Sequence, residues 1–205
     1  MKASHFIAIV VVIAVVVIVW YNAYDGQDDA KYKAQIEKAR EEKDDFMRNG
    51  QGSPFKNVSE PFTGLKYFEP NLKFRIAADL EPIRDKKMIV LQTSDNKTQS
   101  YIEYAYANFT LDDTRCRLLI LEVLDSGPFK GTLFLAFADQ SSAIETYGAG
   151  RYLDVKKTPG ASTITLDFNE AYNPYCAYSN DFSCPFPPKE NILNVNIAAG
   201  EKTYH

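Results

Sequence analysis

Segments in which apolar and polar residues follow a strand-like pattern succeed one another from Lys73 to Ala198. They are rich in β-branched and aromatic residues, and Ile164, Leu166 and Phe168 alternate as one face of a strand requires. Turn-forming clusters separate the segments, with no helical pattern between them. The pattern predicts a mainly β fold, an antiparallel β-sandwich or barrel of about seven to eight strands. The expected strands are Lys73–Leu80, Met88–Thr93, Tyr101–Leu111, Arg115–Leu124, Thr132–Ala138, Thr163–Phe168 and Leu193–Ala198.

A continuous apolar run, Phe6–Tyr21, predicts an N-terminal transmembrane helix. It has 16 residues, slightly fewer than the roughly 20 that cross a bilayer. Trp20 and Tyr24 supply aromatic residues for the membrane interface. With Lys2 on the near side, the charge bias puts the N-terminus in the cytoplasm and the body in the periplasm or outside the cell. Residues 1–26 are therefore interpreted as the signal anchor of a single-pass membrane protein, with the membrane as a partner.

Two alternatives to this anchor stay open. A cleaved signal peptide needs small residues one and three positions before the cut, where Ala23 fits and Tyr21 does not. A helix buried in a protein core would have to accommodate Val, Ile and Ala on every face. The anchor explains the uniform run more simply than either alternative.

Residues 27–50 have the pattern of a charged amphipathic helix. Tyr32, Ile36 and Ala39 recur at helical intervals, and residues of opposite charge stand four positions apart. The segment is expected to be a solvated stalk, with a partner-binding helix as the alternative. Residues 51–205 then form one β-rich domain outside the cytoplasm.

Composition and charge narrow the function classes. The net charge of −4 and the pI near 5.3 argue against nucleic acid as a partner, because nucleic-acid-binding domains normally carry a basic stripe. Common catalytic signatures such as a phosphate-binding glycine loop or a serine-hydrolase elbow are missing. His5 and His205 are the only histidines, so neither a four-ligand metal site nor a cofactor is predicted.

The three cysteines divide into a pair and a single residue. Cys176 and Cys184 lie close together in the sequence and are candidates for a disulfide that closes a small loop in an oxidising compartment. Free thiols and a metal site are the alternatives. Cys116 alternates with apolar neighbours and is expected to be an inert core residue.

The run from Glu145 to Glu201 combines many polar and aromatic residues with Gly and Pro. Such density in irregular chain favours a ligand-binding pocket, for an unknown small molecule, sugar or peptide. Arg151 has a planar guanidinium that matches a carboxylate or phosphate, or it pairs structurally with Asp167 or Glu145. The candidate pocket residues are Tyr147, Arg151, Tyr152, Asp167, Asn169, Tyr172 and Asn173.

Two other function classes remain beside a binding module. A hydrolase would use Asp167, Glu170 or Glu190 as acid and base, and it predicts a carboxyl group with a raised pKa in a cleft. A purely structural interaction domain would use the polar residues only to hold the C-terminal segments together. The sequence names no catalytic residue, and whether the protein is an enzyme stays open.

Several long motifs resemble one known family. ETYGAGRYLD (145–154), LDFNEAYNPYCAY (166–178) and CPFPPKEN (184–191) are similar to the pattern of the domain-of-unknown-function family 1684, within a resemblance from about Arg40 to Lys202. The resemblance implies a small, mostly extracytoplasmic bacterial domain that is often tethered to a membrane. It implies no activity, so the matched residues are site candidates without known roles.

Overall fold

The computed structural model describes residues 28–56, 62–124, 129–156 and 158–205. Within them, six strands form one antiparallel sheet in the order β5-β4-β3-β1-β8, with β2 also paired to β3, and two short strands form a second sheet. The strands are β1 (Arg75–Pro82), β2 (Met88–Gln92), β3 (Thr98–Leu111), β4 (Thr114–Val123), β5 (Leu133–Phe134), β6 (Ala136–Phe137), β7 (Arg151–Tyr152) and β8 (Thr163–Asp167). The short 3₁₀ helices are η1 (Leu72–Phe74), η2 (Phe168–Glu170), η3 (Tyr175–Ala177) and η4 (Lys189–Asn191).

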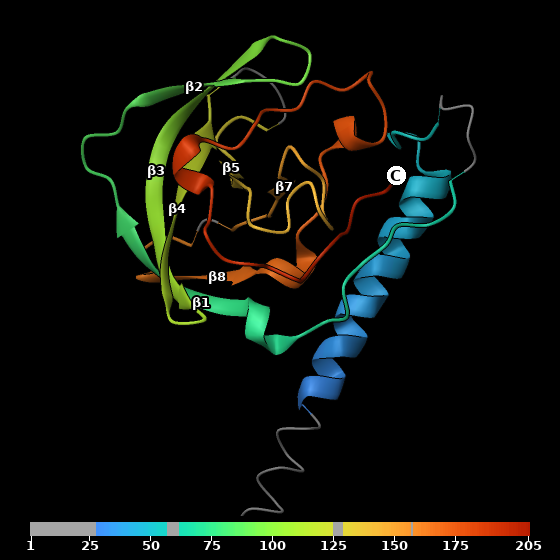
Figure 1. Ribbon diagram of the computed structural model, residues 1–205. Coiled ribbons are helices and arrows are strands. Elements are labelled where there is room, and N and C mark those ends of the chain that lie inside the picture. Colours follow the sequence, from blue (N-terminus) through green and yellow to red (C-terminus); the bar gives the residue numbers. More distant parts are fainter. Residues whose placement is uncertain (1–27, 57–61, 125–128, 157) are drawn as a thin grey trace, which may run out of the picture.

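The long strand β3 organises the main sheet. β4 pairs along one of its edges, whereas β2 and β1 follow one another along the other edge. The register between β3 and β4 shifts between Glu103 and Ala105, and a bulge of this kind bends a strand. Figure 1 shows the sheet curving from β2 to β1 and β8, with the C-terminal loops on its concave side. The C-terminal loops therefore pack against the concave face of the sheet.

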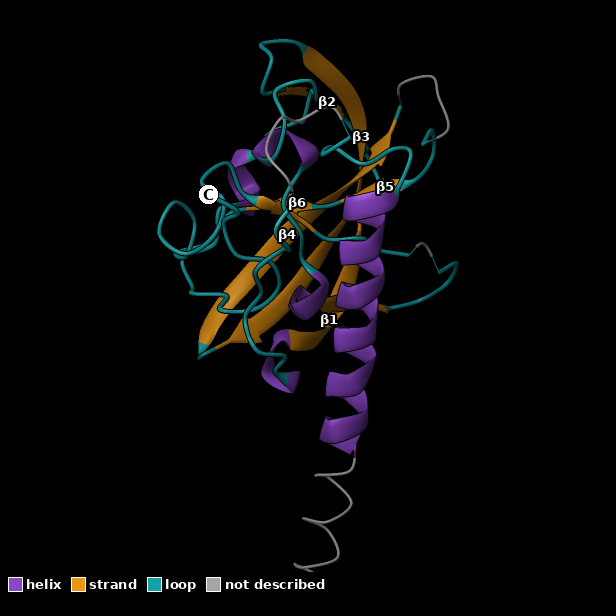
Figure 2. Ribbon diagram, turned by 90° about the vertical axis from the view of Figure 1, so that its right-hand side faces the viewer, coloured by secondary structure: helices purple, strands orange, loops and turns teal. Residues whose placement is uncertain are grey.

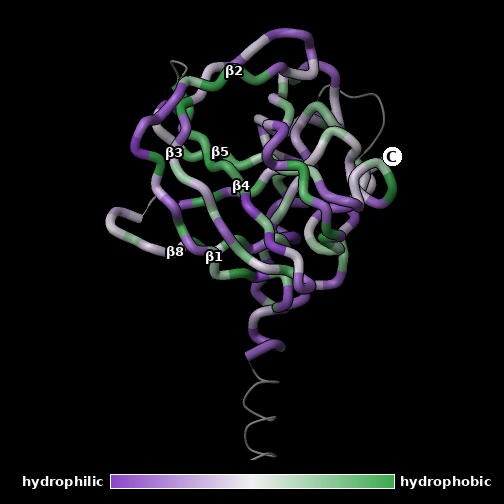
Figure 3. The backbone as a smooth tube through the Cα atoms, turned by 60° about the vertical axis from the view of Figure 1, so that its left-hand side comes forward, coloured by the Kyte–Doolittle hydropathy of each residue, from purple (hydrophilic) through white to green (hydrophobic). Residues whose placement is uncertain are grey.

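The main core lies between the curved sheet and the C-terminal loops. Leu118 and Ile120 of β4 are buried there with Leu166 of β8, and the rings of Phe137 and Phe168 meet edge to face at 5.1 Å. The intervening positions of β4 bury a second, smaller cluster, so β4 is covered on both faces. Figure 3 shows apolar stretches in β2, β3 and β5, which border this second cluster. Burial of apolar surface on both sides stabilises the sheet.

The fold is mainly β and antiparallel, but the prediction of a sandwich or barrel was wrong. The described sheet ends at β5 and β8 without closing, and the β6–β7 pair is too small to be a second layer. No strand forms over residues 193–198, although Leu193, Val195 and Ile197 are buried in alternation. This segment instead packs on the core as extended chain, with the Leu193 N–H donating to the Ala138 carbonyl at 2.8 Å.

An α-helix covers residues 28–49 and lies along one side of the domain (Figures 1 and 2). Tyr32, Ile36 and Met47 are buried at intervals that place them on one helix face, and most other helix positions are exposed or half-buried. The helix is therefore packed against the domain along one stripe.

The predicted transmembrane helix needs correction. Within the described part of the chain, no helix is both long and apolar enough to cross a membrane, and the helix 28–49 carries charges on most of its turns. The apolar run Phe6–Tyr21 lies outside the described residues. The described residues therefore do not support the predicted membrane-spanning element, the membrane as a partner or the single-pass location.

Candidate functional site

A cleft of about 1030 Å³ lies between the helix 28–49, the sheet and the C-terminal loops. Its size is near the upper end of the range for small-molecule sites. Segments far apart in the sequence supply its walls. The helix contributes Ile36, Ala39, Arg40 and Lys43, the sheet contributes Tyr101, Leu133 and Phe134, and the C-terminal part contributes Tyr152, Asp154, Asn169, Glu170, Tyr172, Tyr175 and Cys184.

Aromatic rings form much of the cleft wall. Tyr152 meets Phe134 edge to face at 5.0 Å, and it meets Tyr172 at 6.0 Å in the same manner. The Tyr152 hydroxyl donates to the Pro185 carbonyl at 2.6 Å, and the Tyr172 hydroxyl donates to Asp154 at 2.9 Å. Because both hydroxyls are engaged, these tyrosines offer a ligand ring surface more than hydrogen bonds.

Arg40 is a charged residue of the cleft wall. Its guanidinium lies 4.5 Å from the centre of the Tyr67 ring, donates to Glu37 at 3.2 Å and reaches the Asn169 carbonyl at 3.5 Å. Arg40 is only 9% exposed, yet its Nε has no hydrogen-bond partner among the described residues, and the buried Tyr67 hydroxyl has none either. Burial lowers the pKa of Arg40 and raises that of Tyr67. Buried donors without partners are uncommon in folded proteins.

Of the seven predicted pocket residues, the structure places some in the cleft wall and the others away from it. Tyr152, Asn169 and Tyr172 line the cleft, whereas Tyr147, Arg151, Asp167 and Asn173 do not. Arg40, Lys43 and Tyr67 line it as well, and sequence reasoning missed them. Arg40 did leave a signal, because it stands four residues after Ile36 on the buried stripe of the helix.

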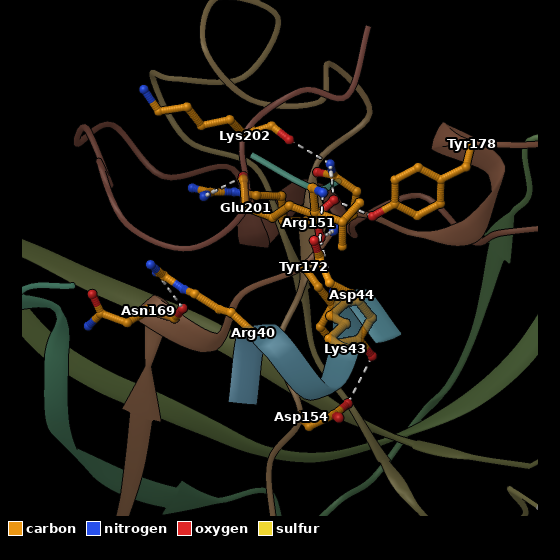
Figure 4. Close-up of polar contacts among 12 residues, drawn as sticks. Arg40, Lys43, Asp44, Arg151, Asp154, Asn169, Tyr172, Tyr178, Glu201 and Lys202 are labelled. Carbon is orange, nitrogen blue, oxygen red and sulfur yellow. Dashed lines mark hydrogen bonds and ion pairs between the residues drawn. The ribbon is translucent and has the colours of Figure 1, made fainter. Parts of the chain in front are cut away.

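Arg151 is a core residue rather than a surface clamp. It is 1% exposed, and its Nη2 donates to Asp139 at 2.7 Å and to the Ile197 carbonyl at 3.0 Å. Its Nη1 donates to the carbonyls of Ala199 and Glu201. Figure 4 shows the Arg151 side chain beside Glu201. The guanidinium therefore joins three backbone carbonyls and one carboxylate, and it holds the C-terminal segment against the β6–β7 pair.

The partner of Arg151 differs from the two expected from the sequence. Neither Asp167 nor Glu145 contacts it, and Asp139 takes that role. Phe137 is the register partner of Arg151 in the β6–β7 pair, so Asp139 lies two positions further along the facing chain. A pairing of only two residues leaves no pattern in the sequence, which is why this partner could not be predicted.

Glu201 is the centre of a second buried network (Figure 4). Its side chain is fully buried and accepts from Lys43 Nζ at 3.0 Å, from the Asn173 backbone N–H at 3.2 Å and from Asn173 Nδ2 at 2.8 Å. The Tyr178 hydroxyl donates to it as well. The Lys43 ammonium also lies 4.7 Å from the centre of the Tyr172 ring. Glu201 thus ties the helix 28–49 to the C-terminal loops, and Asn173 has a structural role.

Asp167 and Asn169 bind the helix 28–49 and the chain before β1 to the end of β8 and to η2. The Tyr32 hydroxyl donates to both oxygens of Asp167, at 2.8 and 2.9 Å, and Arg75 lies 3.4 Å away. The Asn169 side chain donates to the Asn71 carbonyl at 2.9 Å and accepts from its N–H at 2.8 Å. These polar groups are therefore used within the fold, although Asn169 also lines the cleft.

Comparison with known proteins gives a family. The model of the family described as Protein of unknown function (DUF1684) matches residues 60–202. The chain belongs to the DUF1684 family. It is also similar to the solution NMR structure of an uncharacterized protein from gene locus rrnAC0354 of Haloarcula marismortui, with 34% identity and a TM-score of 0.65. That match covers 87% of this chain and 99% of the other. No curated protein matches the chain.

The family match leaves the cleft without an established role. The description of DUF1684 names no activity, and the helix 28–49, which supplies one wall, precedes the matched residues. The membrane-tethered or secreted nature implied by the resemblance is not confirmed. The chemistry of the cleft in this DUF1684 protein therefore depends on its own side chains.

Among the carboxylates that line the cleft, Glu170 has the most unusual environment. It lines the cleft next to Asp154, whereas Asp167 and Glu190 do not. Partial burial, helped by the carboxylates of Asp167 and Asp154, raises the pKa of Glu170 above the ordinary value of 4.5. Folding therefore shifts the Glu170 carboxyl towards its protonated form relative to an ordinary glutamate.

Replacing Glu170 by Gln is expected to change how stability depends on pH. A carboxyl with a raised pKa in the folded state stabilises below its unfolded pKa, and this contribution disappears as pH rises through the folded value. The melting temperature of the wild type, relative to Glu170→Gln, should therefore fall as the pH rises above the ordinary glutamate value of 4.5. Thermal unfolding of both proteins at increasing pH measures the difference. A constant difference would contradict the raised pKa.

The candidate disulfide residues are neighbours in space. The Cys176 backbone N–H donates to the Cys184 sulfur at 3.2 Å, and the Tyr147 hydroxyl lies 3.9 Å from the Cys176 sulfur. All three cysteines, including the buried Cys116, are thiols in this structure. Burial and the contact with Cys176 raise the pKa of Tyr147 to about 12. Tyr147 therefore belongs to the thiol pair and not to the cleft.

Proposed function

We propose that this protein is a ligand-binding domain whose cleft accepts a small apolar or aromatic carboxylate. The aromatic walls suit a flat apolar body, and Arg40 with Tyr67 suits an acceptor group at one end. The observation that carries the proposal is the charged side chain of Arg40, which stacks on Tyr67 in the wall of a cleft with many aromatic rings.

The charges around the cleft favour a ligand with a single negative charge. Lys43 is already paired with the buried Glu201, so its charge is largely compensated. Asp154 and Glu170 also line the cleft and would repel a multiply charged anion such as a phosphate ester. A guanidinium donates charge-assisted hydrogen bonds to a carboxylate, and its planar shape matches the two oxygens of that group.

A matched pair of probes tests this proposal. The full chain is expected to bind 1-naphthoate more tightly than the uncharged 1-naphthamide, as measured by isothermal titration calorimetry. Arg40→Met should weaken 1-naphthoate binding about tenfold or more, because a hydrogen bond to a charged group contributes about 1.5–3 kcal/mol. Binding of the amide should change much less, since it lacks the charge.

Lys38→Met is the control for this experiment. Lys38 is 76% exposed on the same helix and does not line the cleft, so its replacement should leave both affinities unchanged. The thermal midpoints of the variants show whether each is folded. Equal affinity of Arg40→Met and wild type for 1-naphthoate, or no binding of either probe, would contradict the proposal.

The raised pKa of Glu170 in the cleft favours a second candidate, acid–base hydrolysis of a bound substrate. In that case the wild type should hydrolyse p-nitrophenyl esters or glycosides, and Glu170→Gln should lower the rate by about a hundredfold or more. Turnover by neither protein argues for binding alone.

A further inference from the structure

The two cysteines of the C-terminal loops form a chemical site that the cleft does not explain. Cys176 lies in η3 and is half-buried, whereas Cys184 is buried and forms part of the cleft wall. The Cys176 N–H points at the Cys184 sulfur at 3.2 Å. The Cys184 sulfur is therefore held against the Cys176 backbone, and a side-chain hydrogen bond links the two thiols.

The surroundings of the pair make the two thiols unequal. A hydrogen bond from Cys184 is the main cause that lowers the pKa of Cys176, and the side chains of Ser94 and Tyr147 add to it. The same contact raises the pKa of Cys184, and burial raises it further. The half-buried Cys176 is thus the thiol that loses its proton more easily, and the buried Cys184 thiol donates the hydrogen bond that stabilises it. In thiol chemistry the thiolate is the nucleophile.

The loop that contains Cys184 is held in place independently of the pair. The Ser94 N–H donates to the Cys184 carbonyl at 2.9 Å, and the Cys184 N–H donates to Ser94 Oγ at 3.1 Å. Cys184 is therefore fixed against the turn between β2 and β3, with its sulfur directed to Cys176. A fixed second thiol beside a reactive one is the arrangement that a resolving cysteine requires.

We propose that Cys176 and Cys184 are a redox-active dithiol that exchanges with low-molecular-weight disulfides. The Cys176 thiolate attacks one sulfur of the disulfide, forms a mixed disulfide and releases the first thiol. Cys184 loses its proton and attacks the Cys176 sulfur, which forms the Cys176–Cys184 bond and releases the second thiol. The protein is oxidised by two electrons and the small disulfide is reduced to two thiols, which take one proton from Cys184 and one from the solvent.

Cys116 provides an internal comparison. It is 6% exposed, its sulfur lies 3.6 Å from the Thr114 carbonyl, and burial raises its pKa. It has neither a second thiol beside it nor thiolate character, so it is expected to stay inert. The two thiols are a different site from Arg40 and Tyr67, to which the proposed function assigns carboxylate binding. The dithiol chemistry does not depend on that function.

The full chain treated with oxidised glutathione at neutral pH tests the proposal. Intact mass should show the loss of two hydrogens and no bound glutathione, and peptide mapping should place the bond between Cys176 and Cys184. Iodoacetamide should alkylate Cys176 of the reduced chain at least about tenfold faster than Cys116. Glutathione retained on Cys116, or equal alkylation rates, would overturn the proposal.

Two variants separate the attacking thiol from the resolving one. Cys184→Ser should trap one glutathione on Cys176, because no second thiol remains to release it. Cys176→Ser should react at least about tenfold more slowly than the wild type, since the remaining thiol is buried and not activated. Rapid glutathionylation of Cys176→Ser would reverse the assigned roles and overturn the mechanism. The mapping on the wild-type chain decides the pairing even if a variant does not fold.

Discussion

Replacement of Asp139 by Ala is expected to lower the free energy of unfolding by about 3–5 kcal/mol, because it leaves a buried guanidinium without its counter-ion. The Arg151–Asp139 pair is 2.7 Å long, and the two side chains are 1% and 0% exposed. Arg151 also holds three backbone carbonyls of the C-terminal segment, so its displacement disturbs the core beneath the cleft. Urea unfolding of the variant and the wild type measures the loss.

An exposed ion pair on the same protein serves as the control. Lys38 and Glu42 lie 3.8 Å apart with side chains 76% and 70% exposed. Surface pairs of this kind contribute little, so Lys38→Ala should unfold at nearly the wild-type urea concentration. A similar, small effect for Asp139→Ala would show that the buried pair does not hold the C-terminal segment.

Replacement of Glu201 by Gln is expected to lower the free energy of unfolding by about 3 kcal/mol and to loosen the helix 28–49. The carboxylate accepts from Lys43, Asn173 and Tyr178, which are all donors. An amide in its place turns one acceptor into a donor and removes the charge that Lys43 needs. Hydrogen exchange of the helix amides should speed up more than that of the amides in β3 and β4.

Glu42→Gln is the matched control for the helix. Glu42 lies on the same helix but is exposed, so its replacement should leave the exchange rates of the helix unchanged. If Glu201→Gln destabilises the protein without faster exchange over residues 28–49, the network stabilises the C-terminal loops alone. In that case the helix is held by its apolar stripe.

The sequence predicts local features of this fold better than its closure. Six of the expected strand segments overlap observed strands, because alternation and β-branched residues are local signals. The seventh, 193–198, has the alternation of a strand but packs on the core as extended chain. Whether a sheet closes or stays open depends on which strands meet at its edges, and no local pattern contains that information.

The candidate site was less predictable, for a physical reason. A polar residue in a loop has the same appearance in the sequence whether it is buried against a distant partner or faces a ligand. Asn173 and Arg151 are examples, because their partners Glu201 and Asp139 lie elsewhere in the chain. Arg40 was detectable only as a charge that interrupts the buried stripe of a helix.

In the described part of the chain, side chains of the helix 28–49 bond β8 and the C-terminal loops: Tyr32 to Asp167, Arg40 to the Asn169 carbonyl and Lys43 to Glu201. No described strand pairs with it, so the sheet stays intact if the helix tilts away. Helix motion would widen the cleft along the wall that Arg40 occupies. In that case a bulky molecule enters at the rate at which these few side-chain contacts separate. The width of the closed opening does not by itself exclude such a molecule.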